Sequence, residues 1–229
     1  MKEIKKVDAW RFIMFILLSI SAGAIIGVGA TASLLANLYM GELGKLVGAF
    51  LFSLGIYAVV VFNLKLFTGM IADIPTLGVK NWWQLAVCFV GNILGVALTA
   101  FLVRYCFVGE YVVSQATTLI QSKLSAENWA IKVLCSAILC GMLITASVKS
   151  YKLAPIKSVS GTLGIILPVV VFAFCGFDHS VANMMYFYCL GEISWQIIGY
   201  VLLSIVGNVL GGVLFPCITW LQQNKLKDE

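Results

Sequence analysis

The chain has 229 residues, of which 61% are hydrophobic and only 11% are charged, and its mean hydropathy is +1.01. Because about a quarter of the residues of a soluble domain are charged, this composition excludes a soluble globular protein and indicates an integral membrane protein. The formal net charge of +5 does not indicate a nucleic-acid partner, since the basic residues are divided among short loops and tails.

Six apolar segments are long enough to cross a bilayer, whose hydrocarbon core takes about 20 residues of helix. In chain order they cover about 12–36, 46–78, 83–106, 130–148, 160–190 and 193–221. The stretch before the first, MKEIKKVDAWRF, is basic and amphipathic and lacks an Ala-x-Ala cleavage pattern. We expect it to lie along the cytoplasmic interface rather than to be a cleaved signal peptide.

The second and fifth apolar segments are each too long for one simple span, and each is interrupted by polar residues. NLKLFTG (63–69) interrupts the second, and CGFDHS (175–180) interrupts the fifth. Non-helical backbone at membrane depth occurs only where it is buried in protein or lines a wet cavity. Both breaks are therefore predicted to point toward the inside of the protein.

The distribution of basic residues predicts the orientation of the chain. With a cytoplasmic N-terminus, ten of the fifteen Lys and Arg residues fall on the inner side and four on the outer side, namely Lys45, Arg104, Lys123 and Lys132. This excess favours cytoplasmic N- and C-terminal segments. The polar stretch 109–128 is expected to be an outer connection without a role in the chemistry.

The two halves of the chain resemble each other. VGNILGVAL (90–98) recurs as VGNVLGGVL (206–214), and VVVF occurs at 59–62 and again at 169–172. With three spans per half, the second half enters the membrane from the opposite side, which predicts one all-α transmembrane domain over residues 1–229, built from inverted repeats at about 10–108 and 128–221. In such proteins the substrate site lies where the two broken helices meet.

The repeated motif contains residues of two kinds. Its glycines form GxxxG pairs, which usually pack helices closely: Gly91 with Gly95, and Gly207 with Gly211. Asn92 and Asn208 are buried amides that need hydrogen-bonding partners, and the sequence leaves open whether one or both reach the substrate pathway.

The motif GFDHSVANM (176–184) holds the only histidine of the chain, His179, with Asp178 before it. A lone histidine is in general more often a hydrogen-bonded packing residue, but its place in a helix break at membrane depth favours a functional role. The seven cysteines form no C-x-x-C pair. We therefore predict no disulfide, metal site or cofactor.

LFTG in the second segment, GFDHSVANM in the fifth and GNVLGG in the sixth resemble the formate/nitrite transporter family of bacterial anion channels. The resemblance covers nearly the whole chain. It implies an aquaporin-like protomer, a homopentamer with one pore per subunit, and passage of small monovalent anions of weak acids across the bacterial inner membrane. It places His179 at the centre of the pore, with Asp178 before it, Thr68 facing it and Asn208 on the sixth helix. It also implies apolar constrictions formed by Phe52 and Phe172 on one side of the histidine and by Leu66 on the other, with a contribution from Ile56.

This resemblance suggests a mechanism. A bare anion loses much hydration energy in a ring of Phe and Leu side chains, whereas a neutral acid does not. Lys65 and the helix ends would draw the anion in, and Thr68 and His179 would offer hydrogen-bond donors. Either a proton joins the anion before the constriction, or a protonated His179 balances its charge. Asp178 is expected to orient the histidine or to raise its proton affinity.

Lys65 bears on the choice of substrate. Its alternative role is that of a lysine whose ammonium reaches the headgroups. The loop NLKLFTGM resembles the hydrosulfide branch of the family, and Gly141 or a neighbouring small residue stands where formate channels often carry Asn. Hydrosulfide is thus the first predicted substrate, and formate or nitrite the second.

Two other classes of protein fit less well. A neutral-solute pore of the aquaporin type would carry paired Asn-Pro-Ala motifs, which this sequence lacks. A membrane-embedded enzyme would need a third group beside Asp178 and His179, such as a serine nucleophile or a metal cluster. We therefore do not expect an enzyme.

Overall fold

The computed structural model describes residues 2–153 and 158–225, and all regular structure within them is helical. Five helical segments are long and apolar enough to cross a membrane: Ala9–Tyr39, Gly41–Val61, Val79–Arg104, Trp129–Lys152 and Trp195–Lys225. Val159–Phe174 is a shorter apolar helix. The protein is therefore an all-helical membrane protein, as the composition predicted.

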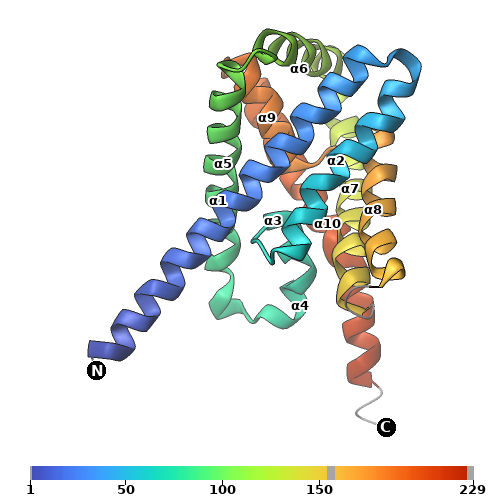
Figure 1. Cartoon of the computed structure of the whole chain (residues 1–229). Coiled ribbons are helices and arrows are strands. Elements are labelled where there is room, and N and C mark those ends of the chain that lie inside the picture. The colour runs from blue at the N-terminus through green and yellow to red at the C-terminus, as the bar shows by residue number, and fades with distance from the viewer. Residues whose placement is uncertain (1, 154–157, 226–229) are drawn as a thin grey trace.

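The helices form a bundle, with shorter helices both among the long ones and at the two ends (Figure 1). In the first half they are α1 (Lys2–Tyr39), η1 (Gly41–Leu43), α2 (Gly44–Val61), α3 (Phe67–Met70), η2 (Ile71–Asp73), α4 (Ile74–Leu77), η3 (Val79–Asn81) and α5 (Trp83–Arg104). In the second half they are α6 (Gly109–Leu124), α7 (Trp129–Leu153), α8 (Val159–Phe174), α9 (Ser180–Leu190) and α10 (Trp195–Lys225).

The basic N-terminal stretch differs from the prediction. It is not a separate interfacial segment, because residues 2–39 form the single continuous helix α1, which projects beyond the rest of the bundle (Figure 1). Residues 2–22 contain no Pro or Gly, so the helical hydrogen bonds run through the boundary between the basic stretch and the apolar span. The expected cytoplasmic tail after residue 225 lies outside the described residues.

The two predicted breaks are present and begin in the same way. Asn63 and Gly176 each adopt a left-handed backbone, with φ of +51° and +70°, directly after the last turn of α2 and of α8. In both breaks the left-handed residue donates to the carbonyl three residues back, Asn63 N to Val60 O and Gly176 N to Ala173 O, both at 3.2 Å. The residue after it donates to the carbonyl five residues back, Leu64 N to Val59 O and Phe177 N to Phe172 O, both at 2.9 Å. This is the Schellman pattern that ends helices.

These matched bonds fix which residues of the two halves correspond. Asn63 corresponds to Gly176, so Lys65 corresponds to Asp178 and Leu66 to His179. In this register VVVF at 59–62 does not correspond to VVVF at 169–172 but to residues 172–175. The recurrence of VVVF was therefore misleading as a guide to register, because a run of β-branched residues fits any buried turn of helix.

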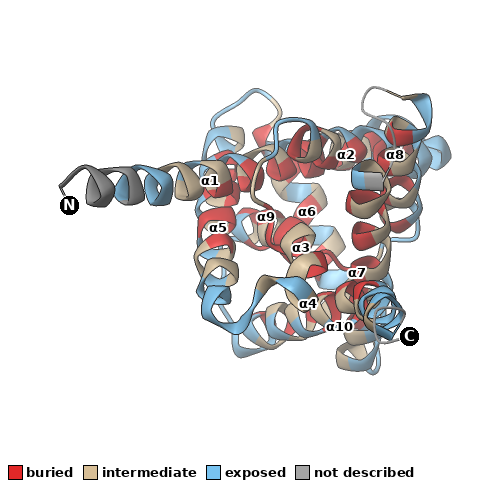
Figure 2. Ribbon diagram, turned by 90° about the horizontal axis from the view of Figure 1, so that it is seen from below, coloured by how far each residue is buried: buried red, intermediate tan, exposed pale blue. Residues whose placement is uncertain are grey.

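The glycines of the repeated motif pack helices, as predicted. A Cβ atom added to Gly95 would lie 1.9 Å from the carbonyl oxygen of Ile20 on α1, and one added to Gly211 would lie 1.9 Å from that of Ile138 on α7. Buried residues lie on α1 and α5 and on α7 and α10, where these pairs pack, and also on α2, α8 and α9 (Figure 2). These two close pairs frame the breaks.

Candidate functional site

His179 is the N-cap residue of α9, directly before its first residue. Its backbone is extended, its side chain is almost completely buried, and its Nδ1 accepts a hydrogen bond from the backbone N–H of Ala182 at 3.0 Å. A ring nitrogen that accepts cannot carry a proton. The proton of the imidazole is therefore assigned to Nε2, and the ring is neutral in this arrangement.

The imidazole joins the two breaks. Its Nε2 lies 2.9 Å from Oγ1 of Thr68 on α3, and with the proton on Nε2 the histidine donates and the threonine accepts. The hydroxyl hydrogen of Thr68 has no acceptor among the described residues. Thr68 is itself almost completely buried, and it does not line the cavity that His179 reaches.

Two phenylalanines cover the histidine. The ring of Phe172 stacks on the imidazole at 5.9 Å and 18°, and Phe52 meets Phe172 edge-on at 5.4 Å. Both were predicted constriction residues, and both line a cavity with His179. The other two, Ile56 and Leu66, are buried and do not line that cavity.

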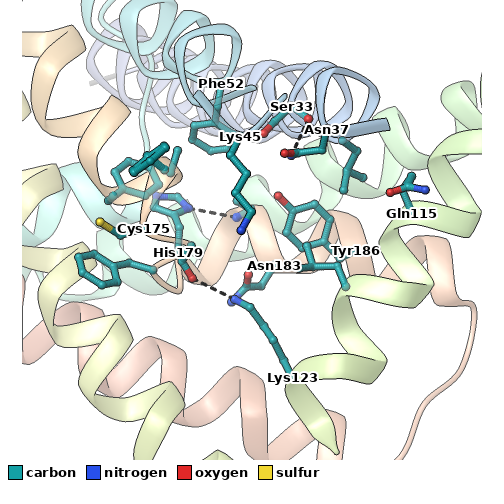
Figure 3. Close-up of a pocket in the computed structure, with 18 of the residues that line it drawn as sticks. Ser33, Asn37, Lys45, Phe52, Gln115, Lys123, Cys175, His179, Asn183 and Tyr186 are labelled. Carbon is teal, nitrogen blue, oxygen red and sulfur yellow. Dashed lines mark hydrogen bonds between the residues drawn. The ribbon is translucent and has the colours of Figure 1, made fainter. Parts of the chain in front are cut away.

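The cavity has a volume of about 520 Å³ and opens toward the end of the bundle that carries α6. Its polar side chains come from several helices: Ser33 and Asn37 of α1, Lys45 of α2, Gln115 and Lys123 of α6, and Asn183 and Tyr186 of α9 (Figure 3). The charged side chains that line it are lysines, and no carboxylate of the described part of the chain does so. The cavity is thus a basic chamber that ends at the Phe52, Phe172 and His179 rings.

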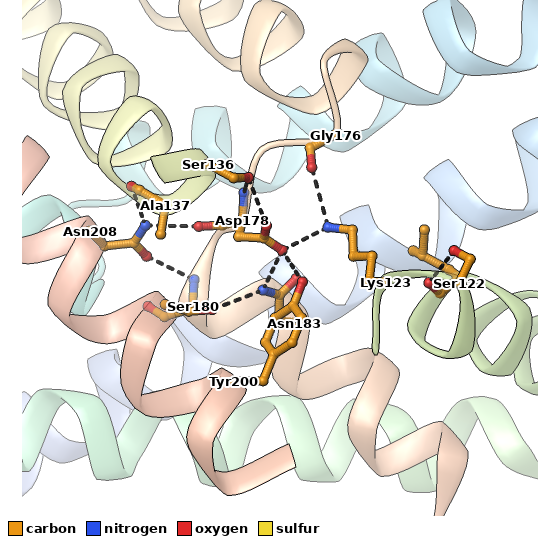
Figure 4. Close-up of polar contacts among 12 residues, drawn as sticks. Ser122, Lys123, Ser136, Ala137, Gly176, Asp178, Ser180, Asn183, Tyr200 and Asn208 are labelled. Carbon is orange, nitrogen blue, oxygen red and sulfur yellow. Dashed lines mark hydrogen bonds and ion pairs between the residues drawn. The ribbon is translucent and has the colours of Figure 1, made fainter. Parts of the chain in front are cut away.

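Asp178 does not act on the imidazole as predicted. Its carboxylate makes no contact with His179 and is instead surrounded by four donors (Figure 4): Lys123 Nζ at 2.7 Å, Ser136 Oγ at 2.7 Å, Asn183 Nδ2 at 3.1 Å and the hydroxyl of Tyr200. Neighbouring side chains of an extended segment point to opposite sides. Asp178 therefore fixes the break itself, while His179 faces the cavity.

The stretch 109–128 is more than an outer connection, which corrects the prediction. It contains the helix α6, whose Lys123 lines the cavity, pairs with Asp178 and donates to Gly176 O at 3.2 Å. These partners lie 53 and 55 residues along the chain, so sequence spacing gave no sign of the contact. The available signal was the amphipathic pattern of the stretch, which predicts a helix packed on one face.

Asn92 and Asn208 hold the breaks by equivalent hydrogen bonds. Asn92 Oδ1 accepts from Phe67 N and its Nδ2 donates to Lys65 O, both at 2.8 Å. Asn208 Oδ1 accepts from Ser180 N and its Nδ2 donates to Asp178 O, also at 2.8 Å. The second amide hydrogen of each binds a backbone oxygen of a neighbouring helix. Both amides are fully used by the backbone and do not line the cavity.

Two residues considered for substrate choice lie away from the cavity. The side chain of Lys65 does not line it, while its backbone oxygen is bound by Asn92. Gly141 packs against α10, because an added Cβ would lie 2.4 Å from Asn208 O. No larger side chain fits there, and the polar residue that α7 brings to the site is Ser136.

The described residues contain no group of three or more His, Cys, Asp or Glu side chains that could hold a metal ion.

A profile of the family described as formate/nitrite transporter matches residues 1–221. The chain belongs to the formate/nitrite transporter family. Members of this family are channels or transporters and not enzymes.

Named relatives agree with this assignment. The chain is 29% identical over 207 residues to the Uncharacterized transporter YrhG of Bacillus subtilis, covering 82% of this chain and 75% of that one. It is 29% identical to the Formate channel FocA of Escherichia coli, covering 73% of this chain and 62% of that one, and 27% identical to the Nitrite transporter NirC of Salmonella typhimurium, covering 93% and 84%.

Two solved structures share the fold. One, described as a pentameric formate channel with formate bound, superposes with a TM-score of 0.77 at 22% identity and covers 93% of this chain and 97% of its own. The other, an FNT family ion channel, gives a TM-score of 0.79 at 23% identity and covers 96% and 94%.

Proposed function

We propose that this formate/nitrite transporter family protein is a selective channel or proton-linked transporter for small monovalent anions of weak acids in the bacterial inner membrane. The observation that carries the proposal is the buried His179 and Thr68 pair at the end of a basic cavity, behind two phenylalanine rings. The cavity end that carries α6 is the outer side, and both termini are cytoplasmic.

The geometry supports passage as the neutral acid. The bond from Ala182 N keeps Nδ1 unprotonated, so protonating the imidazole requires that this bond be broken. An anion that takes up a proton from the outer solution loses its charge before it reaches the Phe52 and Phe172 rings, which removes the cost of desolvating an ion. Thr68 then donates its free hydroxyl hydrogen to the solute, and His179 fixes the direction of that hydroxyl.

Hydrosulfide is the first substrate of this proposal, because the loop NLKLFTGM resembles the hydrosulfide branch of the family. Formate or nitrite is the second, supported by the relatives named as a formate channel and a nitrite transporter. Gly141 does not support hydrosulfide over formate, because this glycine is required for the packing of α7 against α10.

We further propose a homopentamer in which each protomer has its own pore, on an aquaporin-like scaffold of six spans in two inverted repeats. The solved relative described as pentameric and the matched contacts of the two breaks support this assembly and architecture. The mass of the purified particle, corrected for detergent, tests the subunit number.

The decisive experiment is flux into proteoliposomes. Hydrosulfide, formate, nitrite and chloride are compared over a pH series for the wild type, His179→Ala, Thr68→Val and Thr68→Ser. Loss of a hydrogen bond to a charged or partly charged solute is worth about 1.5–3 kcal/mol. We therefore expect Thr68→Val to lower weak-acid flux by at least about tenfold, while Thr68→Ser retains it.

Chloride, the anion of a strong acid, is the matched control and should pass poorly at every pH. Equal flux of chloride and weak acids, or swelling by glycerol without anion flux, would contradict the proposal, the second result indicating a neutral-solute pore. If His179→Ala leaves all fluxes and their pH dependence unchanged, the imidazole has no part in permeation.

A further inference from the structure

The cavity contains a lysine that the site described above does not use. Lys45, near the start of α2, points into the cavity toward the space beside His179 and Asn183 (Figure 3). Lys123 enters the same cavity from α6. Two cations from different helices thus face one chamber.

The two lysines differ in how their charge is compensated. Lys123 is paired with the buried carboxylate of Asp178 at 2.7 Å. Within residues 9–152 and 158–225, no carboxylate oxygen lies within 4.0 Å of the Lys45 ammonium, and Glu42, three residues earlier, does not line the cavity. The net positive charge of the chamber therefore comes from Lys45.

His179 does not supply this charge, because its Nδ1 accepts from Ala182 N and its ring is neutral. An anion that enters the cavity consequently has one uncompensated cation near it. Lys45 is exposed to solvent at the cavity, and a charge in a cleft with low-dielectric walls raises the local concentration of counter-ions at low ionic strength.

We propose that Lys45 recruits anions into the cavity and balances their charge at the outer edge of the constriction. Lys45 is thus a specificity-determining residue that favours anions over cations and neutral solutes at the entrance. The inference rests on the proposed function only for the later step, in which the recruited anion crosses.

A thiol already present in the cavity allows a test that does not depend on transport. Cys175 lines the same chamber and is exposed. In a background with serine at the other cysteines that are not buried, Cys106, Cys135 and Cys217, the rates of Cys175 modification by an anionic and a cationic methanethiosulfonate are compared. Their ratio measures the electrostatic potential at the thiol.

The ratio of the anionic to the cationic rate is measured for Lys45→Gln, Lys45→Arg and the matched control Lys132→Gln, an exposed lysine of α7 that does not line the cavity. At low ionic strength we expect Lys45→Gln to lower the ratio by about tenfold, and the other two variants to keep the wild-type ratio. In 1 M salt, where the screening length is about 3 Å, the difference should disappear.

An unchanged ratio in Lys45→Gln would overturn the proposal, as would an equal slowing of both reagents, which would indicate a closed cavity. In proteoliposomes Lys45→Gln should lower anion entry at low salt but leave uptake of the neutral acid at low pH unchanged. If the wild type transports no anion but the ratio of the two Cys175 modification rates still depends on Lys45, the proposed function is refuted. The recruitment of anions by Lys45 is then still supported.

Discussion

At the scale of the residue, Asp178 and His179 are neighbours with separate tasks. The carboxylate of Asp178 binds Lys123 and Ser136, whereas the imidazole of His179 binds Thr68 and lines the cavity. Asp178 therefore acts as a positioning residue, which holds the break and α6 together through an ion pair that is nearly buried on the carboxylate side.

Substituting one partner of this pair should destabilise the protein. Asp178→Asn leaves the Lys123 ammonium without a counter-charge in a partly buried place, for which we expect a loss of about 3 kcal/mol. Thermal denaturation of the purified protein in detergent measures the loss.

The double variant Lys123→Met with Asp178→Asn is the control for this prediction. It removes both charges, so it should be more stable than either single variant, and the cycle gives a coupling energy that isolates the pair. Additive losses would show that the 2.7 Å contact contributes no interaction of its own.

Some residues of the site could be predicted from the sequence and others could not. His179 was identifiable because it is the only histidine and lies in a break, and Thr68, Phe52 and Phe172 followed from the family resemblance. Lys123 and Ser136 were not identifiable, since they reach Asp178 across 55 and 42 residues. Contacts of this kind depend on how α6 and α7 pack and have no local pattern.

At the scale of the element, each break is held by one asparagine. Asn92→Ala and Asn208→Ala each remove three hydrogen bonds to buried backbone. Unpaired buried backbone groups are costly, so we expect each variant to lose about 3 kcal/mol of stability and the two losses to be similar.

The two asparagine variants should differ in transport. Asn208 binds the backbone on both sides of His179, so Asn208→Ala should also change the pH dependence of flux. Asn92 binds the backbone around Leu66, and its variant should keep the wild-type pH dependence. Identical pH profiles for the two variants would contradict this division.

Close helix packing gives a second prediction at this scale. Gly211→Ala places a Cβ atom 1.9 Å from Ile138 O, so α7 and α10 must move apart, at a cost of about 3 kcal/mol. Gly199→Ala on the same helix meets only an ordinary contact at 3.5 Å from Trp129 and should leave the melting temperature unchanged or slightly higher. Equal melting temperatures for the two variants would refute the packing argument.

The sequence predicted the apolar helices and both breaks well, because composition and polar interruptions are local signals. The sequence did not give the correct alignment of the two halves, because the two VVVF runs do not occupy equivalent positions. It also did not show that the N-terminal stretch is part of the helix α1. Which residues cap a break depends on a helix far along the chain. The sequence therefore shows that the two asparagines are repeated but not that they bind the backbone of the breaks.

At the scale of the whole molecule, the cavity distinguishes the two ends of the helix bundle. Cys175 lies in the cavity at the α6 end, whereas α1 begins at the opposite end (Figure 1). In cells, a membrane-impermeant thiol reagent added outside should therefore label a variant whose only accessible cysteine is Cys175, and an anion in excess should slow the labelling. Labelling only from the cytoplasmic side of inverted vesicles would reverse the predicted orientation.

The correspondence of Leu66 with His179 has one more consequence. The scaffold around the breaks is nearly two-fold, with the same turn, the same amide clamp and the same glycine contacts in each arm. The residues at the equivalent position of the two breaks differ: the first break has the hydrocarbon side chain of Leu66 and the second has the imidazole of His179. A solute on the proposed route meets base and hydrocarbon in opposite orders when travelling inward and outward, so a symmetric frame still yields a passage with a built-in polarity.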